Sequence, residues 1–231
     1  MFGAWQVGAW RALAPAIHID MVVGASVGAL NGWAIAGGAS PDELAQAWLD
    51  RESADLIRPC FPSPWLFDAA PLHRMAQALV ERYRPVIRFA TTLTEVPGLR
   101  VHMVRGEKMT WHHLAASCTI PGGFPPQQLD GKWFVDGGLM GALPVWAAAA
   151  MGADRVIALD ALPLLPSRVL RSGVGMLRRV RNAPATPPCT LVRLVPLRPL
   201  GRLRDAIYWK RDNAARWMEQ GQHDARHTLA R

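Results

Sequence analysis

The segment "VVGASVGALNG", residues 22–32, constrains the fold more than any other part of the sequence. A run of β-branched residues ends at Gly24, Ser26 follows, and a stretch of helical length begins directly after it. The pattern G-x-S-x-G between a buried strand and a helix is typical of the sharp turn that exposes a nucleophilic serine. The alternative is a glycine-rich turn in which the serine has no chemical role.

The G-x-S-x-G pattern predicts a role for each residue around the serine. Side chains at Gly24 and Gly28 would collide with neighbouring backbone, so glycine is expected at both positions. Ser26 would lie at the N-terminus of the following helix, where unpaired N–H groups and the helix dipole favour negative charge on a bound oxygen. The backbone N–H of Val27 is a candidate donor to that oxygen.

A serine hydroxyl needs a base before it can act as a nucleophile. The segment "KWFVDGG" predicts a strand that runs into a tight turn, with Asp136 at the strand end and Gly137 and Gly138 after it. Glycines beside an acid let another backbone or a substrate approach closely, so Asp136 is the candidate base. Taken alone, an Asp before Gly-Gly is most often a turn residue.

A Ser-Asp-His triad is the alternative catalytic arrangement. In that chain order the histidine follows the acid, and the histidines after Asp136 are His223 and His227, in a polar and basic tail. His112 and His113 precede the acid and are expected on a helix surface. The sequence therefore favours a pair of serine and aspartate and keeps the triad as a weaker reading.

Strands and helices alternate as far as residue 160. Predicted strands cover 19–24, 86–95, 100–106, 132–136 and 155–162, with a "VPG" turn between the second and the third. Predicted helices cover 27–38, 40–51, 71–83, 110–120 and 144–153. This alternation predicts an α/β domain in which helices cover both faces of a mainly parallel sheet. Residues 59–67, "PCFPSPWLF", predict an irregular surface loop.

The formal net charge of +8 is concentrated in the last third of the chain. Residues 1–150 carry 11 Lys and Arg against 12 Asp and Glu, while residues 151–231 carry 15 against 6. Such a basic segment attracts polyanions, either nucleic acid or an anionic lipid surface. Neither a zinc-finger spacing nor an RNA-binding motif accompanies it, so we do not expect nucleic acid as a partner.

Residues 21–41 are uncharged and long enough to span a bilayer. Ser26, Asn31, Ser40 and Pro41 make the stretch more polar than a usual span, so a transmembrane helix is the less favoured interpretation. The N-terminus lacks the pattern of a secretion signal, and we expect a cytoplasmic chain. Three widely spaced cysteines predict reduced thiols rather than a disulfide framework or a metal site.

Five sequence blocks together resemble the patatin-like phospholipases. They are "GAWQVGAWRAL" (3–13), "GASVGALNG" (24–32), "AASCTIPGGFPP" (115–126), "DGKWFVDGG" (130–138) and "GADRVIALD" (152–160), in the order of that family. The resemblance implies a three-layered, modified α/β-hydrolase fold. It also implies a lipid acyl hydrolase, a serine carboxylic-ester hydrolase that works through an acyl-enzyme without metal or organic cofactor. Ser26 matches the nucleophile of the family's Ser-Asp dyad, and Asp136 matches its base.

The chain departs from the family at two places. In the family, a first strand and a loop G-G-G-x-[KR]-G precede the first block, and the loop supplies oxyanion donors. Here only Gly3 matches the end of that loop, and loss of the strand would expose the edges of its neighbours. Ala142 stands where such sequences commonly have Asn. The alternative function is therefore a catalytically impaired protein of this fold that binds lipid or a partner.

The resemblance ends near residue 162 and sets the expected domain boundary. We expect a patatin-like catalytic domain over residues 1–162, shortened at its N-terminus, and a basic segment over residues 163–231 that packs on or extends it. The loop at 59–67 and the arginine-rich stretch predict peripheral association with anionic membranes. Substrates are expected to be lipids or phospholipids, and the oligomeric state stays open.

Overall fold

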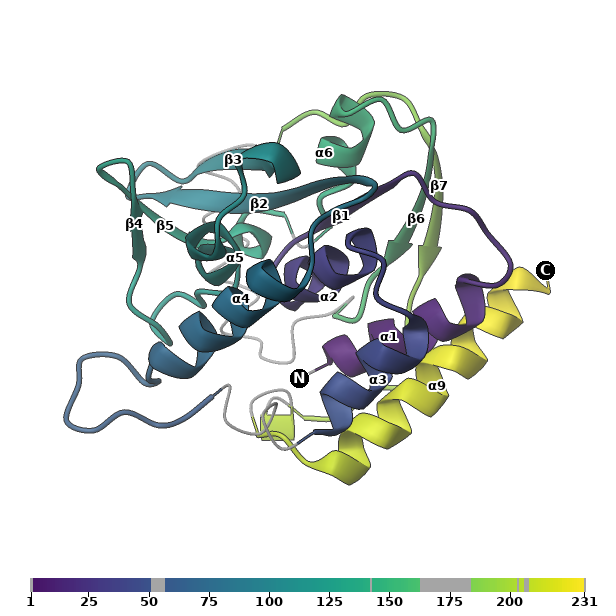
Figure 1. Ribbon diagram of the computed structural model, residues 1–231, viewed down its shortest axis with the longest axis horizontal. Helices are drawn as coiled ribbons and strands as arrows, with labels where there is room; N and C mark the ends of the chain where they lie inside the picture. Colours follow the sequence, from purple (N-terminus) through teal and green to yellow (C-terminus); the bar gives the residue numbers. More distant parts are fainter. Residues whose placement is uncertain are drawn as a thin grey trace.

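A computed structural model describes residues 2–50, 57–141, 143–162, 184–202, 204–205 and 208–230. Its helices and strands agree with most of the predicted segments (Figure 1). For example, Ser40 and Glu43 form the capping box that begins the predicted helix after residue 40. The helices are α1 (Gly3–Leu13), α2 (Val27–Ala36), α3 (Pro41–Leu49), α4 (Ala70–Arg82), α5 (Trp111–Ser117), α6 (Val145–Ala150) and α9 (Arg211–Leu229), with 3-10 turns η2 (Gly106–Lys108) and η3 (Gly137–Leu139). The strands are β1 (Met21–Gly24), β2 (Arg88–Val96), β3 (Arg100–Arg105), β4 (Gln127–Leu129), β5 (Lys132–Asp136), β6 (Arg155–Leu159) and β7 (Thr190–Leu194).

The main sheet contains β1 to β5 and is mixed. β1 pairs with β2 in parallel, whereas β2 with β3, β2 with β5 and β4 with β5 are antiparallel pairs. The α/β class with flanking helices is confirmed, but the sheet is not mainly parallel as we expected. The reason is that residues 97–99 and 130–131 join consecutive strands by turns too short for a parallel crossover.

β1 and β5 run toward each other along the same edge of β2. Gly24, the last residue of β1, lies opposite Thr91, and Asp136, the last residue of β5, lies opposite Leu93. Only Thr92 separates these two positions on β2. The carboxyl ends of two strands that are more than a hundred residues apart in sequence therefore meet head-on.

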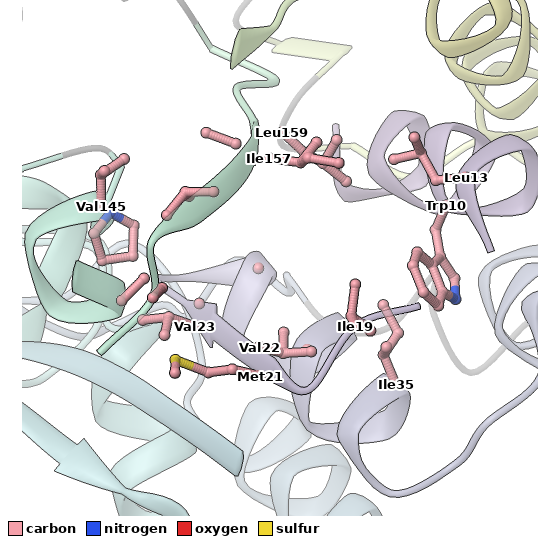
Figure 2. Close-up of a pocket in the computed structure, with 18 of the residues that line it drawn as sticks. Trp10, Leu13, Ile19, Met21, Val22, Val23, Ile35, Val145, Ile157 and Leu159 are labelled. Carbon is pink, nitrogen blue, oxygen red and sulfur yellow. The ribbon is translucent and has the colours of Figure 1, made fainter. Parts of the chain in front are cut away.

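β6 and β7 form a second, parallel pair beside the main sheet. In the described part of the chain, β1 and β6 each pair with one strand. Their other edges face each other across a cavity of about 650 Å³. Figure 2 shows Val22 and Val23 of β1 on one wall, Ile157 and Leu159 of β6 on the other, and Trp10 of α1 at the side.

The helices pack in two groups. α2, α4 and α5 pack together with Phe89 of β2, which meets Trp33 edge to face at 5.3 Å. α1, α3 and α9 form a second core, and Figure 1 shows the yellow C-terminal helix α9 lying along α1. Glycines permit this close contact, because a β-carbon at Gly8 would lie 1.9 Å from the carbonyl oxygen of Met218.

The described part of the basic segment is thus joined to the N-terminal helix. Trp5 of α1 donates its indole N–H to Asp224 of α9 at 2.9 Å, and both side chains are buried. The boundary at residue 162 stays a prediction. The arginine-rich stretch at 167–182 lies outside the described residues. Among the described helices, none combines the length and the apolarity needed to cross a bilayer.

Candidate active site

The turn between β1 and α2 has the geometry that the G-x-S-x-G pattern predicted. Ser26 has φ 55° and ψ −136°, a backbone conformation that residues with side chains rarely adopt. Gly24 leaves the necessary room, because a β-carbon there would lie 2.2 Å from the carbonyl oxygen of Gly28. The same argument fails at Gly28, where a β-carbon would meet only the side chain of Gln6, at 3.7 Å. The expected collision at Gly28 is therefore wrong.

Asp136 lies at the end of β5 and its carboxyl group faces the serine turn. The Ser26 side chain lies close enough to this carboxyl group to lower its pKa, and the Gly138 N–H donates to its Oδ1 at 2.7 Å. Gly137 has no room for a side chain, since a β-carbon would lie 2.1 Å from the carbonyl oxygen of Thr92. Gly137 thus allows the backbone to lie directly against Thr92 of β2, and the backbone N–H of Gly138 donates a hydrogen bond to the Asp136 carboxyl group.

The environment of Asp136 changes its acidity. The residue is 8% exposed, and burial raises the pKa of its carboxyl group to about 6 from an ordinary value of 3.8. Hydrogen bonds from the Ser26 side chain and the Gly138 N–H act in the opposite direction, because they stabilise the ionised form. A carboxylate with a pKa near 6 is a stronger base than an exposed one and is still ionised at neutral pH.

Buried hydroxyl groups support the turn, and the sequence analysis did not identify them. The Ser117 hydroxyl accepts the backbone N–H of Ser26 at 3.0 Å and donates to the carbonyl of Thr92 at 3.1 Å. The Thr91 hydroxyl lies 2.9 Å from Ser117 Oγ and 3.0 Å from the carbonyl of Gly24. Ser117 lies in the sequence block 115–126, one of the five blocks that resemble the family. That resemblance was the one signal in the sequence that could have pointed to Ser117.

The two predicted sources of oxyanion donors lie side by side. A β-carbon at Gly3 would be 2.5 Å from a methyl group of Val27, so the start of α1 touches the start of α2. The Asn31 amide donates to the carbonyl of Gly3 at 3.1 Å, and the Trp48 indole N–H donates to Asn31 at 2.9 Å. Among the described residues, no acceptor is bonded to the Val27 N–H. A donor role for Gly3 or Val27 stays a prediction.

The histidines of the alternative triad lie elsewhere. His223 and His227 stack on each other on α9, with ring centroids 6.5 Å apart, and His223 faces Asp224. His112 stacks on Trp111, and His113 caps α5 through Thr110. No hydrogen bond or ion pair joins a described histidine to Ser26 or Asp136. The geometry offers no support for the triad.

Two further expectations concern the surroundings of the site. Ala142, where the family commonly has Asn, lies outside the described residues. No group of three or more His, Cys, Asp or Glu in the described ranges could hold a metal ion.

The cavity between β1 and β6 reaches the turn at Gly24, Ala25 and Gly28.

The chain is similar to several known proteins. The family model "Patatin-like phospholipase" matches residues 1–149. Patatin-like phospholipase domain-containing protein 7 of Rattus norvegicus is 28% identical over 173 residues, which cover 68% of this chain and 12% of that protein. Lysophospholipase NTE1 of Mycosarcoma maydis is 30% identical over 172 residues, covering 68% of this chain and 9% of that protein. The chain thus spans only about a tenth of the length of these relatives.

A solved structure has the same fold. The crystal structure of VipD from Legionella pneumophila aligns with 99% of this chain and 65% of its own, with a TM-score of 0.52 and 10% sequence identity. At this identity the likeness concerns the fold alone. Taken with the match of the family model over more than half of the residues, it leads to one conclusion: the chain belongs to the patatin-like phospholipase family.

Proposed function

We propose that this chain is a lipid acyl hydrolase in which Ser26 is the nucleophile and Asp136 the base. The observation that carries the proposal is that the serine turn after β1 and the buried carboxyl group of Asp136 at the end of β5 meet beside β2, where the Ser26 side chain lowers the pKa of that carboxyl group. Membership of the patatin-like phospholipase family and the lysophospholipase name of a relative support a lipid ester as substrate.

The first half of the reaction forms the acyl-enzyme. Asp136 takes the proton of the Ser26 hydroxyl, and Ser26 Oγ attacks the carbonyl carbon of the ester. Negative charge develops on the carbonyl oxygen, for which the Val27 N–H at the start of α2 and the N-terminal turn of α1 at Gly3 are the proposed donors. When the tetrahedral intermediate collapses, the alcohol leaves with the proton from Asp136.

The second half releases the fatty acid. Water gives a proton to Asp136 and attacks the acyl carbon, and the second tetrahedral intermediate breaks the bond to Ser26 Oγ. The proton returns from Asp136 to the serine. No step calls for a metal or an organic cofactor. Because Asp136 must be ionised to accept a proton, and its pKa is about 6, the rate should rise with pH through about 6 and level off above it.

Labelling with a fluorophosphonate tests the nucleophile directly, since such probes react with activated serines. We expect labelling at Ser26, and hydrolysis of p-nitrophenyl esters and phospholipid vesicles that falls at least ~10³-fold in Ser26→Ala and Asp136→Asn. The matched control is Asp224→Asn, which changes a buried carboxylate on α9 away from the turn.

Two results decide against the proposal. Activity that survives both Ser26→Ala and Asp136→Asn would remove the dyad. An unlabelled Ser26 in a folded protein would favour the other hypothesis, a patatin-fold protein that binds lipid or a partner without hydrolysing it.

Peripheral association with anionic lipid also stays a proposal. The described part of the expected docking surface is the irregular loop that contains the bridge between Pro59 and Phe67. In this loop Phe61 is 83% exposed and Leu66 is 58% exposed, and the Phe67 N–H bonds the carbonyl of Gly123. Vesicle binding that weakens when Phe61 and Leu66 are both changed to Ser, and with added salt, would support it.

A further inference from the structure

The end of α5 lies beneath both halves of the proposed site. α5 ends at Ser117, and the chain continues through Cys118 to Thr119. Ser117 and Thr119 are fully buried, with 0% exposure. A pair of polar residues without access to water must find its hydrogen-bond partners within the protein, so the atoms they contact are informative.

The hydrogen-bond partners of the Ser117 hydroxyl all belong to the elements of the site. A serine hydroxyl has one hydrogen to donate and two lone pairs to accept. Ser117 donates to the carbonyl of Thr92 and accepts from the backbone N–H of Ser26, at 3.1 and 3.0 Å. The Thr91 hydroxyl lies 2.9 Å from Ser117 Oγ and 3.0 Å from the carbonyl of Gly24, and its one hydrogen is within reach of both acceptors. One side chain thus links α5, β2 and the serine turn.

The same segment also supports the acid. The carbonyl of Thr119 accepts the backbone N–H of Asp136 at 2.9 Å. Thr92, whose carbonyl receives the Ser117 hydroxyl, is the residue over which Gly137 passes. Two residues of the short segment 117–119 therefore hold both halves of the site. The Ser117 side chain accepts the backbone N–H of Ser26, and the Thr119 carbonyl accepts the backbone N–H of Asp136.

We propose that Ser117 is a positioning residue, whose hydroxyl sets the place of Ser26 relative to Asp136. This inference rests on the proposed function, in which those two side chains exchange a proton. Ser26 has a backbone conformation that needs support from its surroundings, and its N–H is held by one side-chain oxygen. Without that oxygen, the turn is free to relax and to carry Ser26 Oγ away from the carboxylate.

Loss of the hydroxyl should change the rate and the pH at which the site works. In Ser117→Ala we expect kcat to fall 10- to 100-fold with little change in KM, because no contact with substrate is removed. The hydrogen bond from Ser26 lowers the pKa of Asp136, so its loss should move the rising limb of the pH profile to higher pH. Ser117→Cys, which keeps a weak donor and acceptor of similar size, should lie between Ser117→Ala and the parent.

A measurement without turnover separates this inference from the proposed function. The titration of the Asp136 carboxyl group can be followed by NMR in the parent, in Ser117→Ala and in Trp217→Phe. Trp217→Phe is the matched control, since it removes one buried hydrogen bond on α9, to the carbonyl of Leu200, and keeps an aromatic ring against Phe2. We expect Asp136 to titrate at higher pH in Ser117→Ala and at the parent's pH in Trp217→Phe.

Each outcome has a definite meaning. If Asp136 titrates at the same pH in Ser117→Ala as in the parent, Ser117 does not position the pair and the inference is wrong. If Ser26 is never labelled by a fluorophosphonate, the hydrolase proposal fails, while the titration still reports whether Ser117 sets the contact. If Ser117→Ala fails to fold, the pH at which Asp136 titrates is compared between Ser117→Cys and the parent instead.

Discussion

At the scale of single residues, the sequence identified the turn but not what holds it in place. A β-branched run that stops at glycine, with a serine two residues later, is a local pattern and can be read directly. Ser117, Thr91 and Thr92 gave no such pattern, because threonines are common in any strand and a buried serine at a helix end looks ordinary. Their role depends on β1 and β5 meeting beside β2, which is a property of the folded chain.

The two glycines of the G-x-S-x-G pattern should respond differently to substitution. Gly24→Ala would place a methyl group against the carbonyl of Gly28, and we expect it to lower the free energy of unfolding by ~3 kcal/mol or to prevent folding. Gly28 lies in the first turn of α2 with free space around it, so Gly28→Ala should be neutral or stabilise by up to ~1 kcal/mol. Urea denaturation of both variants checks this, and equal damage at both positions would contradict it.

Asp136 should reduce the stability of the protein at neutral pH. Its pKa in the folded state, about 6, is above the ordinary 3.8, so between these values the folded protein keeps a proton that the unfolded chain has lost. Stability from this group is therefore full below pH 4 and is lost as the pH rises through 6. At ~1.36 kcal/mol per pH unit, the loss is about 3 kcal/mol.

Asp136→Asn should therefore unfold at higher urea concentration than the parent at pH 8, although we expect this variant to be inactive. The advantage of the variant should shrink steadily toward pH 4, where the parent's carboxyl group is neutral as well. Denaturation curves at pH 4, 6 and 8 measure this difference. A difference that does not vary with pH would mean that Asp136 is not a buried group of raised pKa.

At the scale of elements, the helices and strands could be predicted from sequence, and the "VPG" turn joined β2 to β3, but the other strand pairs could not be predicted. Alternating strands and helices suggested parallel crossovers, yet the middle of the chain consists of hairpins. One of them had a readable signal: Asp130 and Gly131, both with positive φ, form the two-residue Asp-Gly turn that joins antiparallel strands. Read in that way, "LDGKW" would have placed Asp136 at the end of an antiparallel strand.

The contact between α1 and α9 depends on close approach of their backbones, and Gly221 should show it. A β-carbon at Gly221 would lie 2.0 Å from the carbonyl oxygen of Trp5. Helix propensity alone predicts that Gly221→Ala stabilises α9 by ~1 kcal/mol. We expect the opposite, a loss of ~2–3 kcal/mol, because the added methyl group separates the helices and disturbs the bond between Trp5 and Asp224.

Thermal unfolding of Gly221→Ala beside Glu219→Ala decides between these two expectations. Glu219 is an exposed position of the same helix, so its replacement changes propensity without changing the contact. A higher melting temperature for Gly221→Ala would mean that α9 does not pack on α1 as closely as described.

At the scale of the whole molecule, the main sheet and the β6–β7 pair face each other with open edges. Runs of apolar residues such as those of β1 and β6 are typical of strands with neighbours on both sides, and on this ground we expected buried strands. Instead, Met21, Val22 and Val23 are half-buried and Ile157 is 38% exposed, because the cavity lies between the two edges. An apolar sequence pattern indicates that a strand is suited to burial on both sides. Here the described residues do not cover the facing edges of β1 and β6.

Amide hydrogen exchange should distinguish the two edges of these strands residue by residue. The bond from the Arg88 N–H to Asp20 fixes the register of β1, so the N–H of Val22 points to β2 and those of Met21 and Val23 point to the cavity. In β6, the bond from the Thr190 N–H to Asp154 likewise turns the Ile157 N–H to the cavity.

We therefore expect Val23 and Ile157 to exchange at least ~100-fold faster than their neighbours Val22 and Ala158, which are bonded within the pairs. Each comparison is internal to one strand, so global unfolding, which affects neighbours alike, cannot produce the difference. Equal protection of Val22 and Val23 in the same sample would show that the edge of β1 is covered in solution, because only a bonded amide is protected to that degree. The alternation of fast and slow amides along β1 thus tests directly whether the cavity is open in solution.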